Sequence, residues 1–84
     1  MSENRKERKQ LAKAILELHD LYISTGESEK PMTISLPDIA EMAGLPEKET
    51  EEALIQFMDE KLISVAKSAI YILENKKLTK LAHD

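Results

Sequence analysis

Residues 34–61 read ISLPDIAEMAGLPEKETEEALIQFMDEK, and they carry the clearest local signals for the fold. Pro37 suits the first turn of a short helix, because the N–H that proline lacks would have no partner there. Gly44 is a typical end for that helix, and Pro46 opens a second helix over residues 47–60. Two short helices joined by a tight glycine turn are the pattern of a helix-turn-helix unit.

Apolar residues in this stretch recur at the three- and four-residue spacing of amphipathic helices. In the first helix the apolar positions are Ile39, Ala40 and Ala43. In the second helix the inward stripe comprises Thr50, Ala53, Leu54, Phe57 and Met58. Each helix is therefore expected to bury one side in a shared core.

The segment before this unit predicts a long helix, a loop and a brief strand. The apolar face of the helix over residues 4–24 is formed by Leu11, Ala14, Ile15, Leu18 and either Leu21 or Tyr22. Residues 25–31 are mostly polar and include a glycine and a proline, which predicts a loop. Residues 32–35 alternate in polarity and stop before Pro37, which favours a short edge strand.

Two β-rich segments follow the helix-turn-helix unit, at residues 62–65 and 69–73. Only residues 66–68 separate them, a connection short enough for a hairpin. A hairpin that directly follows a helix-turn-helix unit is a wing. The sequence therefore predicts a wing at this position.

The chain closes with a last short helix. Asn75 is a candidate cap for it, and Leu78 and Leu81 are expected to face inward. A length of 84 residues is that of one small domain. We therefore predict a single domain over residues 1–84 that is mainly α with a small β-hairpin wing, an α+β winged helix-turn-helix fold.

The composition excludes several classes of site. The chain has no cysteine, so it forms no disulfide, thiolate metal site or cysteine nucleophile. Its two glycines lie far apart and no nucleophile–base–carboxylate set is recognisable, so we expect no enzyme and no cofactor. His19 has only His83 as a potential co-ligand, so we expect a half-buried structural side chain and no metal.

The sequence also carries no signal for a membrane or for export. No apolar run approaches the roughly 20 residues that a membrane helix needs. The first 13 residues are charged and lack the apolar stretch of a signal peptide. We therefore expect a cytoplasmic protein without a membrane partner.

Several of these segments resemble the DNA-binding domain of the Crp/Fnr family of transcription regulators. The string that leads into the family's recognition helix is similar to Ile34, Ser35, Asp38, Ile39, Ala40, Ala43, Gly44 and Leu45. The end of that helix and the first wing strand resemble Ala53, Leu54, Phe57 and residues 62–64. The opening helix, closing strand and final helix resemble residues 11–18, 70–73 and 78–82. The resemblance covers nearly the whole chain, in the family's order.

The resemblance implies a DNA-binding domain whose recognition helix, residues 46–60, enters the major groove. The residues nearest the bases would be Lys48, Glu49, Glu52 and Gln56. The phosphate contacts would come from Ser35, Lys67 and Ser68. Family members act as homodimers when this domain is joined to a sensor domain and a dimer helix, so the isolated domain is expected to bind double-stranded DNA weakly.

The charge of the predicted recognition helix departs from the family's pattern. Lys48 stands where the family usually has glutamate, and Glu52 stands where it has arginine. The arginine that often follows the family's serine or threonine is Leu36 here. Residues 46–61 hold six acidic residues and two lysines, a formal charge of −4 that equals the charge of the whole chain. Lysine and arginine supply most non-specific DNA affinity by neutralising phosphates, and here they are scarce.

Three interpretations of this acidic helix remain open. The first is a solvated surface. The second is a DNA reader, which is the function that we predict from the resemblance. The alternative function is the docking face of a winged helix that has lost DNA binding and acts as a protein–protein interaction module. The basic start of the chain, residues 5–13, is likewise either a phosphate contact or a solvated helix end. Salt dependence and charge reversal distinguish a DNA reader from a protein-docking surface.

Overall fold

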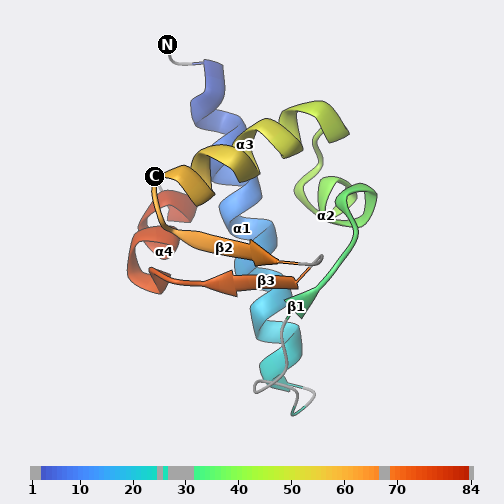
Figure 1. Cartoon of the computed structure of the whole chain (residues 1–84), viewed down its shortest axis with the longest axis vertical. Helices are drawn as coiled ribbons and strands as arrows, with labels where there is room; N and C mark the ends of the chain where they lie inside the picture. The colour runs from blue at the N-terminus through green and yellow to red at the C-terminus, as the bar shows by residue number, and fades with distance from the viewer. Residues whose placement is uncertain (1–2, 25, 27–31, 67–68, 84) are drawn as a thin grey trace.

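The computed structural model describes residues 3–24, 26, 32–66 and 69–83 (Figure 1). Along them lie α1 (Glu3–Ser24), β1 (Met32–Thr33), α2 (Leu36–Ala43), α3 (Glu47–Asp59), β2 (Ile63–Ala66), β3 (Ala69–Ile72) and α4 (Asn75–His83). The described chain is mainly helical with a small antiparallel sheet, which confirms the predicted α+β class. Within the described residues, no helix is both long enough and apolar enough to cross a membrane.

Gly44 ends α2 where the sequence predicts. Its φ of 71° lies in the left-handed region, which glycine adopts without a steric penalty. The N–H of Leu45 then donates to the carbonyl of Ala40 over 3.0 Å, the long bond of a Schellman cap. Because the turn is this tight, α3 begins only a few residues later.

Lys61 ends α3 with the same cap, although it is not glycine. Its φ is 62°, and the N–H of Leu62 donates to the carbonyl of Phe57 over 2.9 Å. A residue with a Cβ adopts this conformation at a cost of about 1–2 kcal/mol. The turn leads the chain from α3 directly into β2.

The sheet has the strand order β1-β3-β2, and both pairs are antiparallel. Val65 pairs with Ile70 and Ile63 pairs with Ile72, so these four side chains share one face of the sheet. Ile63 and Ile70 are buried on that face, whereas Tyr71 on the opposite face is exposed. The sheet therefore covers the core with one face and presents the other to solvent.

α1 runs behind α3 and the sheet in this view, and it contacts α2, α3, α4 and β1 (Figure 1). The fully buried core side chains include Leu11, Ile15, Ile39, Phe57 and Leu78, which come from all four helices. The hydroxyl of Tyr22 accepts the backbone N–H of Thr33 over 3.0 Å and so joins the end of α1 to β1. The choice between Leu21 and Tyr22 on the apolar face therefore falls on Tyr22, since Leu21 is exposed.

The prediction that Met58 belongs to the buried stripe of α3 is wrong. Its side chain is 38% exposed, and the buried residues of α3 are Thr50, Ala53 and Phe57. Successive residues of a helix point about 100° apart, so Met58 points well away from its buried neighbour Phe57. The inward stripe is narrower than predicted because α3 contacts the core along one side only.

Several predicted boundaries shift by one or two residues; β2 and β3, for example, span Ile63–Ala66 and Ala69–Ile72 rather than 62–65 and 69–73. The strand predicted over residues 32–35 is limited to Met32–Thr33, because Ser35 already serves as the N-cap of α2. Asn75 is the first residue of α4 rather than its cap, and the N–H of Leu78 donates to the carbonyl of Glu74 over 3.0 Å. Leu78 is buried, as the sequence predicts.

Candidate interaction surface on α3

α3 has a buried side, an exposed side and two flanks. Thr50 and Phe57 are fully buried, and the Thr50 hydroxyl donates over 2.9 Å to a backbone carbonyl one turn earlier. This bond satisfies the buried hydroxyl inside the helix itself. On the opposite side Lys48 and Glu52 are exposed, and Ile55 is 53% exposed. The side away from the core is therefore open to a partner.

Carboxylates dominate the exposed surface of α3. The exposed carboxylates within the helix are Glu47, Glu51, Glu52 and Asp59, which we call the acidic face. The exposed cation within the helix is Lys48. The surface that points into solvent therefore carries a net negative charge at neutral pH.

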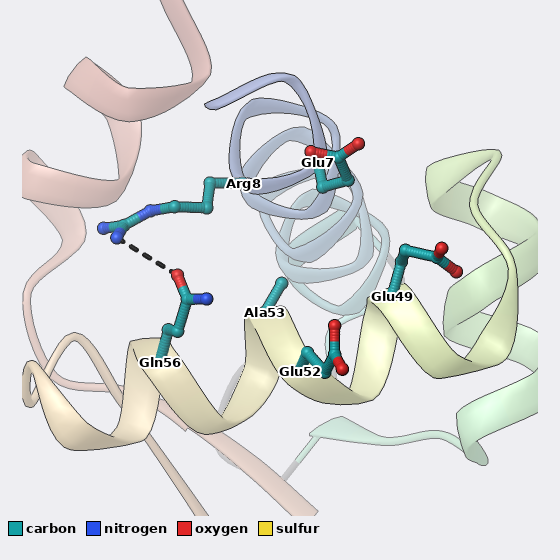
Figure 2. A pocket seen from close by; sticks show the side chains of 6 residues that line it. All are labelled: Glu7, Arg8, Glu49, Glu52, Ala53 and Gln56. Atoms are coloured by element: carbon teal, nitrogen blue, oxygen red, sulfur yellow. Dashed lines mark hydrogen bonds between the residues drawn. The ribbon is translucent and has the colours of Figure 1, made fainter. Parts of the chain in front are cut away.

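Arg8 joins the N-terminal half of α1 to one flank of α3. Its guanidinium donates to Glu60 Oε1 over 2.6 Å. It also donates to Gln56 Oε1 over 3.3 Å, as Figure 2 shows. The same group lies 5.6 Å from the centroid of the Phe57 ring, within reach of a cation–π contact. Arg8 thus binds the side chains of Gln56 and Glu60, which lie one helical turn apart on this flank.

A crevice beside Arg8 gathers further acidic side chains. Its other lining residues are Glu7, Glu49, Glu52, Ala53 and Gln56 (Figure 2). Glu7 Oε2 is buried there and has no hydrogen-bond partner among the described residues. Within this same part of the chain, no group of three or more His, Cys, Asp or Glu side chains is placed to hold a metal ion. We therefore interpret the crevice as the packed boundary between α1 and α3.

An apolar groove lies along the other flank of α3, between α2, α3 and the β2–β3 hairpin. It is lined by Ile34, Leu36, Ile39, Leu54, Val65 and Ile70 and has a volume of about 210 Å³. Val65 is 37% exposed, so the groove opens to solvent. Glu47 and Glu51 precede Leu54 by two turns and one turn, which places them on the same side of α3. Both are exposed, so the groove has an acidic edge.

The structure divides the predicted base-contacting residues of α3 into two sets. Lys48 and Glu52 are exposed. Glu49 and Gln56 are half-buried on the flank that faces α1, where Gln56 accepts the hydrogen bond from Arg8. Glu49, Glu52 and Gln56 come together in the crevice, whereas Lys48 is not among its lining residues.

The predicted phosphate contacts lie outside α3. Ser35 is exposed at the N-cap of α2, and within the described chain its hydroxyl makes no capping bond to that helix. Lys67 and Ser68 lie outside the described residues. Sequence reasoning missed Arg8 as a partner of α3, since its partners lie 48 and 52 positions away and no local spacing signals them.

No protein-family model matches this chain, and no curated protein matches it. A fold of this kind supports many functions, so function must be argued from the surface. Three features carry that argument: the acidic face, the contacts of Arg8 and the apolar groove.

Proposed function

We propose that this chain is a winged helix domain that binds a basic protein partner through the acidic face of α3. The winged helix assignment is supported by the element order, in which the Gly44 turn joins α2 to α3 and the β2–β3 hairpin follows. The observation that carries the function is the excess of carboxylates over Lys48 on the exposed side of α3.

The acidic face disfavours DNA on energetic grounds. Two like unit charges about 4 Å apart in water repel by about 1 kcal/mol. Carboxylates set among phosphates therefore oppose binding. Non-specific DNA binding at Kd values of about 10⁻⁴–10⁻⁶ M provides only about 5–8 kcal/mol in total. A basic protein surface reverses the sign of every one of these charge interactions.

DNA binding by a Crp/Fnr-like regulator domain is the second candidate function. It is favoured by the exposed side chain of Lys48 and by the exposed Ser35 hydroxyl at the start of α2. In this mechanism α3 enters the major groove, Lys48 and Glu52 reach base edges and Ser35 contacts a phosphate. One copy binds weakly, because regulators of this kind place two copies on half-sites one helical turn apart.

An NMR titration of the isotope-labelled protein at low salt tests both candidates. One ligand is a mixed-sequence DNA duplex at about 1 mM, and the other is a helical Lys–Ala peptide of about 15 residues. The proposal predicts salt-sensitive amide shifts along residues 47–59 with the peptide and none with the duplex. Shifts with the duplex at Ser35 and residues 47–56 would establish the second candidate and refute the first.

Charge reversal adds a matched control. Replacing both Glu51 and Glu52 by lysine is expected to abolish peptide binding and to strengthen DNA binding. The control replaces Glu17 and Glu74 by lysine, the same charge change at exposed positions on α1 and before α4. The control should retain peptide binding. Equal loss in both double variants would show that net charge, rather than the surface of α3, attracts the peptide.

A further inference from the structure

We propose that the apolar groove beside α3 receives a large aliphatic side chain of the basic partner. This inference rests on the proposed function, because the acidic face sets the charge of the partner. It adds the chemistry of the contact: an amphipathic helix with leucine or isoleucine on one side and lysine or arginine at the edges of that side.

The lining and size of the groove fit such a side chain. Its six lining residues are all aliphatic, and Val65 at its mouth is 37% exposed. A closed cavity of roughly 150 Å³ with comparable walls holds a benzene molecule. An open groove of about 210 Å³ therefore has room for one leucine or isoleucine side chain. Transfer of that side chain from water into the groove is favourable.

The edge of the groove selects the charge of its occupant. Glu47 and Glu51 lie one helical turn apart on the flank of α3 that carries Leu54. On a partner helix, residues three or four positions from a leucine share its side of the helix. Lysine or arginine at these positions meets Glu47 and Glu51 when the leucine enters the groove. Charge complementarity therefore selects a basic amphipathic helix.

A second copy of this chain complements the groove less well. The most exposed large apolar side chains outside α3 are Leu21 and Leu73 among the described residues. Leu21 lies beside Glu17 and Asp20 on α1, and Leu73 is followed by Glu74. Either one would bring a carboxylate against the acidic edge of the groove. Repulsion between these carboxylates and the acidic edge would oppose self-association.

Two peptides of equal charge test the proposal. The Lys–Ala helix of the earlier titration is compared with a peptide in which alanines on one side are replaced by leucine. Both residues are strong helix formers, so the two peptides differ mainly in apolar volume. The leucine that enters the groove is expected to tighten binding about tenfold. Amide and methyl shifts should extend from α3 to Leu54, Val65 and Ile70 with the leucine peptide only.

Substitutions on the two faces of the hairpin show where on the protein the leucine peptide gains its affinity. Val65→Ser, at the mouth of the groove, should remove most of the leucine advantage. Tyr71→Ser, on the opposite face of the same hairpin, should keep it. Val65→Thr preserves the shape of valine and serves as a second variant should Val65→Ser disturb the hairpin. It should also reduce the gain in affinity from leucine, because it places a hydroxyl in the groove.

The outcomes separate this inference from the proposed function. If the alanine peptide binds the acidic face but leucine adds nothing, the groove proposal fails and the electrostatic proposal stands. The groove proposal also fails if the leucine advantage is equal in wild type, Val65→Ser and Val65→Thr. Binding of neither peptide refutes both proposals. A dimer of the free protein that Val65→Ser dissociates would show that a second copy occupies the groove, and would overturn the inference.

Discussion

Removal of the Arg8 guanidinium should loosen α3 from the N-terminal half of α1. Arg8 makes three contacts with this flank: an ion pair with Glu60, a hydrogen bond to Gln56 and a cation–π contact with Phe57. Arg8→Ala removes all three together with the aliphatic stem of the side chain. The change should therefore lower the free energy of unfolding without altering the fold.

The exposure of the partners limits the size of this effect. The side chains of Arg8 and Glu60 are 24% and 44% exposed, so solvent screening holds their ion pair to about 0.5–1 kcal/mol. The contact with the Phe57 ring adds about 0.5–1 kcal/mol. The long bond to Gln56 adds about 0.5 kcal/mol. Arg8→Ala should therefore cost about 1.5–2.5 kcal/mol, and Glu60→Ala about 0.5–1 kcal/mol.

Urea unfolding followed by circular dichroism measures these changes. With an m value of about 1 kcal/mol/M, typical at the small end of the range, Arg8→Ala should lower the midpoint by about 1.5–2.5 M. A double-mutant cycle with Glu60→Ala isolates the ion pair, with an expected coupling of about 0.5 kcal/mol. Raising the salt from about 0.1 M to about 1 M shortens the screening length from about 10 Å to about 3 Å and should reduce that coupling.

Arg8→Lys is the control for charge alone. Lysine keeps the positive charge but lacks the planar fork that reaches Gln56 and Glu60 together, so it should restore less than half of the lost stability. A midpoint shift below about 0.3 M for Arg8→Ala, with no coupling to Glu60 at low salt, would refute the reasoning. Gln56 and Glu60 would then belong to the solvent-facing surface of α3.

Four further substitutions test the core and the helix ends. Phe57→Ala should cost about 3–5 kcal/mol in thermal unfolding, because it empties a fully buried position. Thr50→Val should change stability by less than about 1 kcal/mol, since the carbonyl that accepts the hydroxyl also accepts the Thr50 N–H over 3.0 Å and stays paired. Lys61→Gly should raise the urea midpoint, with a gain of about 0.5 kcal/mol from relief of the left-handed conformation. Gly44→Ala should cost about 1 kcal/mol from backbone conformation alone, because nothing lies within 4 Å of the added Cβ; unchanged stability would contradict the left-handed turn.

Helix boundaries were predictable where local chemistry sets them. Pro37, Gly44 and Pro46 act on the backbone within a single turn, so residue type alone indicates where α2 and α3 begin and where α2 ends. The β2–β3 hairpin is equally local, because its strands are close neighbours in sequence. Lys61 adopts a left-handed conformation without being glycine, so the end of α3 carries no comparable sequence signal.

The surface was less predictable because it depends on how distant elements meet. Glu49, Gln56 and Lys48 all lie on α3. Glu49 and Gln56 are half-buried because α1 packs against their flank, whereas Lys48 is exposed. The apolar groove is likewise a gap between elements distant in sequence. Several of its lining residues, including Ile39 and Leu54, are recognisable as core residues one by one. The opening between them follows from the packing of α2, α3 and the hairpin.

β1 and β3 meet across the longest span of chain in the sheet. Met32 pairs with Ile70, so all of α2, α3 and β2 lies between the two partners. Closing so long a loop costs more conformational entropy than closing a hairpin, and β1 contributes only two residues to repay it. We expect this pairing to be the part of the sheet that opens first in sub-global fluctuations. Ile34 directly follows β1, and Ile70 on β3 pairs with Met32 of β1. Both isoleucines line the apolar groove, so each such opening separates one wall of the groove while the helices stay folded.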